Sequence, residues 1–121
     1  MKVIIVEDSA IMREALIKLL ADLEEIEIVG YATKVAEAIG LIDKLRPNAV
    51  ILDLRLADGN GLEVLKAIRQ SKFSPLVVVL THSVYPELKQ KCLDEGADFF
   101  LDKTTESEKL LHIFRDSIKN S

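Results

Sequence analysis

The sequence has few of the residues that mark disulfide-stapled, zinc-bound or membrane-spanning proteins. Its 121 residues include one cysteine, Cys92, three prolines, five glycines and no tryptophan. A single cysteine cannot form a disulfide within the chain, and without a Cys/His cluster the sequence offers no zinc site. The first apolar run, residues 3–6, stops at Glu7 and Asp8, far short of a signal-peptide core or of the roughly 20 residues of a membrane helix. We therefore expect a cytoplasmic protein without membrane contact.

Basic charge is also in deficit. Lys and Arg number 16 against 20 Asp and Glu, which gives a net charge of −4 with histidine neutral. This balance argues against direct nucleic-acid binding through phosphates. Hydrophobic residues make up 49% of the chain and charged residues 30%, the proportions of a globular protein. Because the sequence shows neither a repeat nor a linker, residues 1–121 are predicted to form a single domain.

Short apolar runs alternate with stretches of helical periodicity along the whole chain. The predicted strands are residues 2–6, 27–31, 49–52, 76–80 and 99–101. Between them, apolar residues recur three or four positions apart, which is typical of helices that cover a sheet. The pattern predicts an α/β fold, a (βα)5 flavodoxin-like, doubly wound parallel sheet of five strands. We expect the strand order 2-1-3-4-5.

Residues typical of helix ends flank the helical stretches. At the N-terminal ends these are Asp8 or Ser9, Thr33, Pro86, and Thr105 paired with Glu108 as a capping box. Gly96 is typical of a helix C-terminus and is expected to close the fourth helix. Residues 53–61 are rich in turn formers and are predicted to be a loop before the third helix.

Polar side chains follow four of the five predicted strands. They are Glu7 and Asp8 after the first strand, Asp53 after the third, Thr81 after the fourth and Lys103 after the fifth. In an open parallel sheet the ligand site lies outside these carboxyl ends. Taken singly, each residue is explained better by a cap, a turn or a solvated surface charge. Taken together, three carboxylates at adjacent strand ends would repel one another unless a cation lies among them.

This set of residues supports phosphoryl chemistry. The expected cation is a hard divalent ion, Mg²⁺, which takes a few oxygen ligands and keeps several waters. Glu7 and Asp8 can supply these ligands. Asp53 is the natural nucleophile, because a carboxylate can attack phosphorus and form an acyl phosphate. Lys103 and Thr81 would contact the phosphoryl oxygens, the lysine through its charge and the threonine through a hydrogen bond.

Four segments carry a resemblance to a known family over essentially the full length of the chain. They are VEDSAIMR (residues 6–13), VILDLRLADGNGLEVL (50–65), VVVLTHS (77–83) and GADFFLDK (96–103). In this order and spacing they resemble the CheY-like receiver domain of bacterial two-component response regulators. The resemblance implies that Asp53 is phosphorylated by a sensor histidine kinase, a phosphotransfer protein or a small phosphodonor.

The resemblance also implies a metal site. Asp8 and Asp53 would hold Mg²⁺ directly and Glu7 through water, and the backbone carbonyl of Arg55 would complete the protein ligands. A switch is implied as well, in which Thr81 swings toward the phosphoryl group.

Phe100 stands at the family's switch-aromatic position and would turn inward behind the threonine. The surface of the fourth helix, fifth strand and fifth helix would then change and carry the signal to a downstream target protein, to an output domain outside these residues or to a second copy in a phosphorylation-dependent dimer. The chain would be no enzyme beyond self-phosphorylation and slow autodephosphorylation.

Several residues depart from the family pattern. Thr104 follows Lys103 where many receivers have proline, so the cis-proline common there is absent and the loop is expected to be freer. His82 stands where a small residue is usual, and its bulk is expected to hinder phosphodonor access or the movement of the preceding threonine. Arg55 and Ser83 occupy the variable positions that influence how water reaches the phosphoryl group, so a modified rate of dephosphorylation is expected.

The alternative reading is a Mg²⁺-dependent phosphohydrolase with an aspartyl-phosphate intermediate. Such enzymes often carry a second aspartate two residues after the nucleophile, where this chain has Arg55, which cannot donate or accept a proton at neutral pH. A flavin- or nucleotide-binding module would need a phosphate-cradling loop where Glu7 and Asp8 would repel phosphate. Steady turnover of a phosphate ester would identify the hydrolase, and flavin absorbance the third class.

Overall fold

Five parallel strands form one sheet in the order β2-β1-β3-β6-β7 in the computed structural model, which describes residues 1–82 and 84–120. The strands are β1 (Lys2–Val6), β2 (Glu27–Ala32), β3 (Ala49–Leu52), β6 (Leu76–Thr81) and β7 (Phe99–Asp102). Counted along this sheet alone, the order is 2-1-3-4-5, which confirms the predicted topology. Every residue of β3 is buried, as expected for a central strand covered on both faces.

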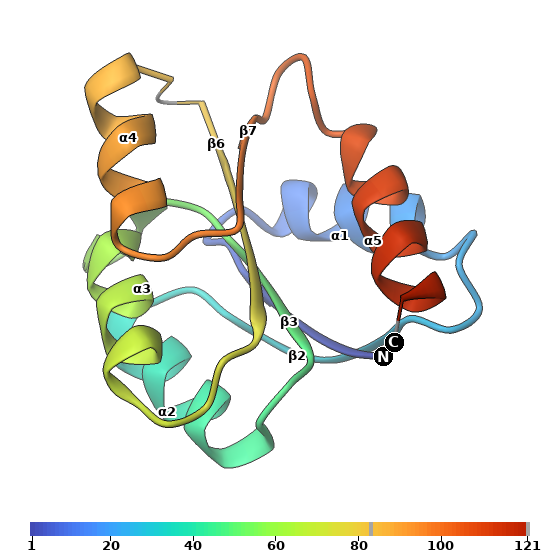
Figure 1. The fold of residues 1–121 in the computed structure, drawn as a ribbon, viewed down its shortest axis with the longest axis horizontal. Coiled ribbons are helices and arrows are strands. Elements are labelled where there is room, and N and C mark those ends of the chain that lie inside the picture. The colour runs from blue at the N-terminus through green and yellow to red at the C-terminus, as the bar shows by residue number, and fades with distance from the viewer. Residues whose placement is uncertain (83, 121) are drawn as a thin grey trace.

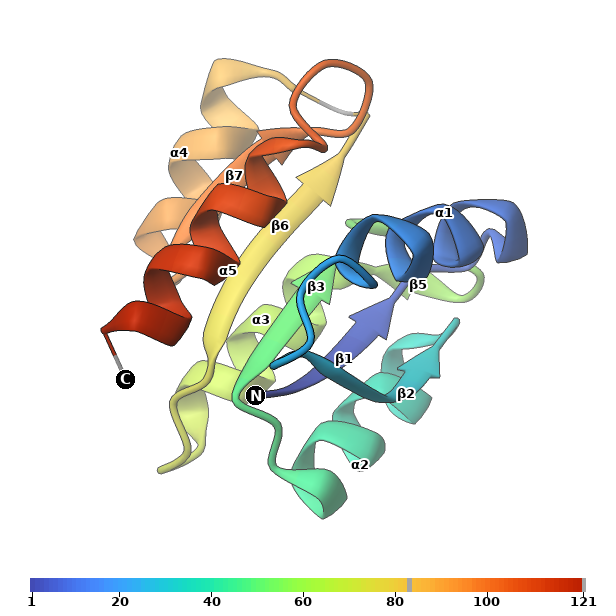
Figure 2. The same ribbon diagram turned by 90° about the vertical axis from the view of Figure 1, so that its right-hand side faces the viewer.

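Helices cover both faces of the sheet, as Figures 1 and 2 show. They are α1 (Ala10–Leu20), α2 (Val35–Leu45), α3 (Gly61–Gln70), α4 (Pro86–Asp94) and α5 (Lys109–Lys119). Because alternate strand residues point to opposite faces, the sheet separates two apolar cores. Ile5 packs with residues of α1 and α5, and Ile4 packs with residues of α2, α3 and α4. No helix among the described residues is both long and apolar enough to cross a membrane.

Three predicted helix ends are confirmed. The Ser9 hydroxyl accepts a hydrogen bond from the Met12 N–H at 3.2 Å and caps α1. Pro86 lies in the first turn of α4. Gly96 follows that helix with a φ of +103°, a conformation that side chains with a Cβ rarely adopt.

The predicted cap of α2 is wrong. Its N-cap residue is Lys34, not Thr33, and no side-chain bond is made by that cap. The Asp58 carboxylate, from the loop after β3, accepts instead from the Val35 N–H at 2.7 Å. Glu37 accepts from the Thr33 N–H at 2.7 Å. The donors at this helix end are therefore satisfied partly by a residue 23 positions away.

The predicted capping box of α5 is also wrong. Glu108, the residue expected to close the box with Thr105, is itself the N-cap and makes no side-chain cap bond. The carboxylate of Glu106, two residues before Glu108, accepts a hydrogen bond from the Asp102 N–H at 2.9 Å. Glu106 also pairs with Lys109, the first residue of α5, so it links the end of β7 to the start of the helix without forming the predicted box.

The loop after β3 contains a short hairpin that the turn formers alone did not indicate. Its strands are β4 (Arg55–Leu56) and β5 (Gly59–Asn60), which pair antiparallel. The Asn60 side chain then accepts from the Leu62 N–H at 2.9 Å and begins α3. The hairpin lies directly after Asp53, so it shapes the backbone beside the predicted nucleophile.

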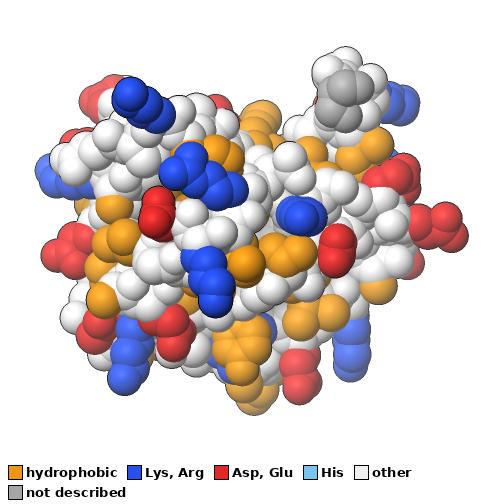
Figure 3. All heavy atoms as spheres, turned by 90° about the horizontal axis from the view of Figure 1, so that it is seen from below, with side chains coloured by type: hydrophobic (Ala, Val, Ile, Leu, Met, Phe, Trp, Pro, Cys, Tyr) orange, Lys and Arg blue, Asp and Glu red, His pale blue; other side chains and the backbone are white. Residues whose placement is uncertain are grey.

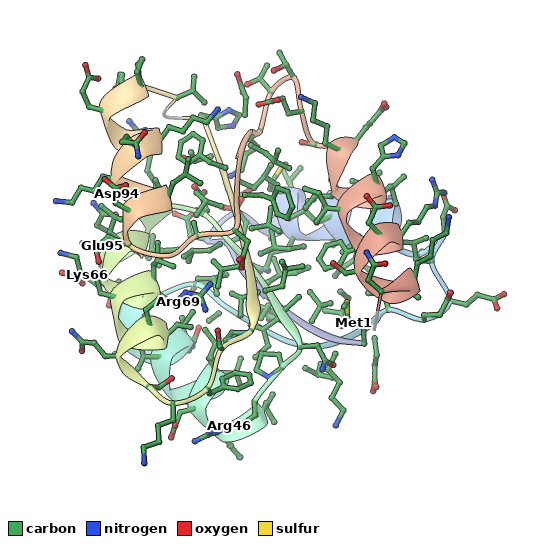
Figure 4. The ribbon with its side chains drawn as sticks, in the orientation of Figure 1. Met1, Arg46, Lys66, Arg69, Asp94 and Glu95 are labelled. Atoms are coloured by element: carbon green, nitrogen blue, oxygen red, sulfur yellow. The ribbon has the colours of Figure 1, made fainter. Side chains whose placement is uncertain are left out.

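Arg69 joins α3 to the turn between α4 and β7. In Figure 4 its side chain points from α3 toward the strands, while Lys66 on the same helix points outward. Its guanidinium donates to the Gly96 carbonyl at 2.9 and 2.6 Å, to the Pro75 carbonyl at 3.1 Å and to Asp98 at 3.2 Å. These bonds fix the C-terminal end of α4 against the sheet.

Charge is mixed on the face of the molecule seen from below in Figure 3, where acidic and basic side chains alternate around small apolar areas.

Candidate functional site

Four side chains come together where the strands end at their carboxyl edge. Glu7 follows β1, Asp53 follows β3, Thr81 ends β6 and Lys103 follows β7. In residues 1–82 and 84–120, these four are the polar or charged residues that are buried, each with at most 8% of its surface exposed. Burial of polar groups is unfavourable unless they pair. Their concentration at one edge of the sheet therefore marks a site and confirms the convergence expected from the sequence.

Lys103 is the centre of this group. Its ammonium donates to Asp53 Oδ2 at 2.8 Å and also to Glu7 Oε1. One positive charge is thus shared by two buried carboxylates, which leaves an excess of negative charge in a poorly solvated place.

The ionisation of Glu7 and Lys103 reflects this imbalance. Burial raises the pKa of Glu7 to about 7, and the neighbouring Asp53 charge adds to the increase, while the hydrogen bond from Lys103 opposes it. Burial lowers the pKa of Lys103, but the hydrogen bonds and charges of Asp53 and Glu7 outweigh burial and raise it overall. The lysine therefore stays protonated, and the carboxylates favour a further cation.

Asp8 completes an acidic cluster. One carboxylate oxygen from each of Glu7, Asp8 and Asp53 lies within 4.8 Å of the others. Because Ser9 caps α1, the Asp8 carboxylate is not needed as the cap. Asp8 is exposed to solvent, whereas Glu7 and Asp53 are buried. The donors are carboxylate oxygens only, and one side is open to water. This donor set fits a hard cation such as Mg²⁺, which prefers oxygen ligands and keeps part of its water shell.

The backbone on both sides holds Asp53 in place. Its N–H donates to the Val6 carbonyl at 2.9 Å, and its Oδ1 accepts from the Arg55 N–H at 3.3 Å. Gly61 lies so close that a Cβ there would meet the Asp53 carbonyl oxygen far inside contact distance. The side chain of Arg55 is exposed, and the metal role of its carbonyl stays a prediction.

Thr81 ends β6 and Lys103 directly follows the adjacent strand β7, so the pairing of the two strands ends at the site. Thr81 pairs with Asp102 in register, and the Lys103 N–H donates to the Thr81 carbonyl at 2.9 Å. The residues that follow them, His82 and Thr104, are joined by a side-chain hydrogen bond, with His82 Nδ1 3.0 Å from Thr104 Oγ1. We call this His82–Thr104 hydrogen bond the loop bridge.

Thr104 is more constrained than its replacement of proline suggested. Besides the loop bridge, its N–H donates to Asp102 Oδ1 at 2.8 Å, a bond that proline cannot make. The described residues contain no cis peptide bond, in keeping with the missing proline. The structure thus differs from the freer loop expected after Lys103. Ser83, the other residue of this region expected to influence the rate, lies outside the described residues.

Phe100 is buried in the core under α2, α3 and α4, whereas its neighbour Phe99 is 40% exposed. Phe100 also lines a groove between α4, β7 and α5, together with Lys89, Lys109 and Ile113. The ring is therefore already directed into the protein here, and its rotation as a switch stays a prediction.

Sequence reasoning missed Arg13. Its guanidinium donates to the Glu7 carbonyl at 3.0 Å and lies 4.3 Å from the centre of the Tyr31 ring. It therefore fixes the backbone of the acidic cluster from α1, and the ring on β2 holds it there. Its position one turn into the helix after β1 was the available signal, because that turn faces back toward the strand end.

Comparisons with known proteins identify the family of the chain. Residues 3–115 match the response regulator receiver domain family. The chain is 31% identical over 120 residues to the transcriptional regulatory protein YdfI of Bacillus subtilis, a match that covers 99% of this chain and 56% of YdfI. It is 36% identical over 110 residues to a protein-glutamate methylesterase/protein-glutamine glutaminase of Methanococcus maripaludis, covering 90% of this chain and 30% of that protein. A crystal structure of a DNA-binding response regulator of the LuxR family from Staphylococcus aureus has a TM-score of 0.86 at 29% identity, over 95% of this chain and 96% of that chain.

The chain therefore belongs to the response regulator receiver domain family. It spans about half the length of YdfI and about a third of the methylesterase. The activities in those names are properties of those whole proteins.

Proposed function

We propose that this chain is a phosphorylation-activated switch of a two-component system and that Asp53 is its phosphoacceptor. The observation that carries the proposal is the burial of Glu7, Asp53, Thr81 and Lys103, a nucleophile with its charge partners and a hydroxyl, at one edge of the sheet. Family membership over residues 3–115 supports it. An Asp53 oxygen attacks phosphorus while the bond between phosphorus and the donor's leaving group breaks.

The surrounding residues have distinct roles in this proposal. Asp8, Asp53 and the Arg55 carbonyl would hold Mg²⁺ directly and Glu7 through water, and the ion would supply charge neutralisation at the phosphoryl oxygens. Lys103 already donates to Asp53 and is positioned to follow the charge onto the phosphoryl group. Arg55 and Ser83 set the rate at which water reaches the phosphoryl group, and His82 limits the access of phosphodonors.

The signal leaves through α4, β7 and α5. Thr81 moves toward the phosphoryl group and Phe100 follows, so the groove beside Lys89 and Lys109 changes shape. We propose that residues 1–121 act as one receiver domain, that the donor is a sensor histidine kinase or a phosphotransfer protein, and that the receptor is a target protein, an output domain or a second copy of the chain. No metabolic substrate is proposed, and the place of action is the cytoplasm.

Intact mass after incubation with a small phosphodonor tests the proposal. We expect a single phosphoryl adduct that requires Mg²⁺ and is absent from Asp53→Asn. Asp22→Asn, a change of an exposed carboxylate in a turn, is the matched control and keeps the adduct. An adduct of equal yield on Asp53→Asn would overturn the assignment. Steady turnover of a phosphate ester by the wild type would favour the phosphohydrolase instead.

A further inference from the structure

The loop bridge joins the two loops that carry the proposed phosphoryl contacts. Backbone pairing between β6 and β7 ends with Thr81 and Lys103. One residue further along each chain, His82 and Thr104 are both exposed, yet their side chains meet at 3.0 Å. The two residues that depart from the family pattern beside these contacts are thus each other's partner.

We propose that the loop bridge is a latch that holds the site in its resting arrangement and slows phosphorylation of Asp53. This inference rests on the proposed function, because the latch acts on the movement of Thr81. His82 follows Thr81 directly, so the threonine cannot shift toward Asp53 unless its neighbour moves with it. Thr104 stays in place, since its N–H is bonded to Asp102. The shift therefore breaks the side-chain hydrogen bond.

The expected effect is modest because both partners are exposed to water. A net hydrogen bond of this kind changes an equilibrium or a rate by roughly two- to tenfold. A bond present in the resting state and absent from the phosphorylated state affects formation of the aspartyl phosphate and leaves its hydrolysis unchanged. His82 and Thr104 are accordingly positioning residues and make no contact with the phosphoryl group in this proposal.

Substitutions can separate the hydrogen bond from the bulk of the imidazole. Thr104→Val keeps the shape of the side chain without its hydroxyl, and His82→Phe keeps a ring without its nitrogens. Thr104→Ser retains the hydroxyl. Thr105→Val makes the same change at the adjacent exposed threonine, for which the structure shows no side-chain hydrogen bond among the described residues.

The rate of adduct formation with a small phosphodonor and Mg²⁺ is measured by intact mass for each variant, with thermal unfolding in parallel. We expect Thr104→Val and His82→Phe each to raise the rate by roughly threefold. The double variant should be no faster than either, because both changes remove one bond. Thr104→Ser and Thr105→Val should match the wild type, as should the hydrolysis rates of all variants.

Additive effects, or an unchanged rate in Thr104→Val, would overturn the latch. A faster His82→Ala beside an unchanged His82→Phe would assign the effect to the bulk of His82. A change in unfolding temperature without a change in rate would give the bridge a purely structural role. These results are distinct from failure of the proposed function, in which the wild type forms no adduct that depends on Asp53.

Discussion

A single methyl group at Gly61 is expected to disturb both the fold and the site. A Cβ built at this residue lies 2.9 Å from Leu54 Cα and 3.1 Å from the Asp53 carbonyl carbon, with the carbonyl oxygen closer still. Ordinary contacts begin near 3.4 Å, and the carbonyl oxygen is the closest atom, so backbone beside the nucleophile must move by roughly 1 Å. All these atoms belong to main chain, which cannot rotate away as a flexible side chain does. The strain also acts on the hydrogen bond from the Gly61 N–H to the Leu54 carbonyl, now 2.8 Å long.

Overpacking of this kind costs about 1–3 kcal/mol, and weakening the hydrogen bond adds about 1 kcal/mol. Gly61→Ala should therefore lower the free energy of unfolding by about 3 kcal/mol. With a urea m-value of about 2 kcal/mol/M, the unfolding midpoint falls by about 1.5 M. Displacement of Asp53 should also slow adduct formation on the order of tenfold.

Gly40→Ala is the matched control, because this glycine lies within α2 and a Cβ there meets nothing within 4 Å. Alanine is a better helix former, so the variant should gain about 0.5–1 kcal/mol. The two identical substitutions are thus expected to have opposite signs. Equal stability of Gly61→Ala and the wild type, within about 0.5 kcal/mol, would refute the argument from close approach.

Three further predictions concern charge, anchoring and the single thiol. In urea unfolding without Mg²⁺, Lys103→Met should lower the free energy of unfolding by about 3 kcal/mol, because two carboxylates stay buried without a partner. Asp8→Asn should raise it by about 0.5 kcal/mol by relieving repulsion among the carboxylates. A gain in stability for Lys103→Met would contradict this charge balance. Arg69→Met should lower the free energy of unfolding by about 2 kcal/mol, because it leaves carbonyl groups unpaired. Lys66→Met, on the outer side of α3, should stay within about 0.5 kcal/mol of the wild type. Equal losses in the two variants would contradict the anchoring role of Arg69. Burial raises the pKa of Cys92 to about 11, so a thiol reagent at pH 8 should label it only after unfolding. The stability that the buried neutral thiol contributes is complete below its unfolded pKa of about 8.5 and is lost as pH rises through 11. Labelling of the native protein at pH 8 would contradict the burial of this thiol.

The strands and their order could be predicted because a strand buried on both faces reads as an uninterrupted apolar run. β3 and β6 show this most clearly, and the polar residues that follow them marked the site for the same reason. The rule that parallel strands end at one edge then brought Glu7, Asp53 and Lys103 together without coordinates. Among the five strands of this sheet only the ends differ from the prediction, as where β6 extends through Thr81.

The features that could not be predicted depend on partners distant in sequence. Asp58 binds the N-terminus of α2 from the neighbouring loop, and no local pattern distinguishes it from any turn aspartate. Thr105 and Glu108 have capping-box spacing, but α5 begins only at Lys109, so Glu108 is itself the N-cap and Thr105 lies outside the helix. The loop bridge joins residues 22 positions apart, and sequence could say only that each is unusual.

The site lies at the carboxyl edge of the sheet that separates the two apolar cores, and this limits how a change at Asp53 can reach the surface. Thr81 is buried at the end of β6 and leads directly into the loop before α4. The other end of α4 is fixed, because Arg69 holds the Gly96 carbonyl through two hydrogen bonds. A shift of Thr81 should therefore displace the N-terminal end of α4 while its C-terminal end stays against the sheet. The proposed switch should change the surroundings of the exposed Tyr85 at the start of α4 and leave those of Gly96 unaltered.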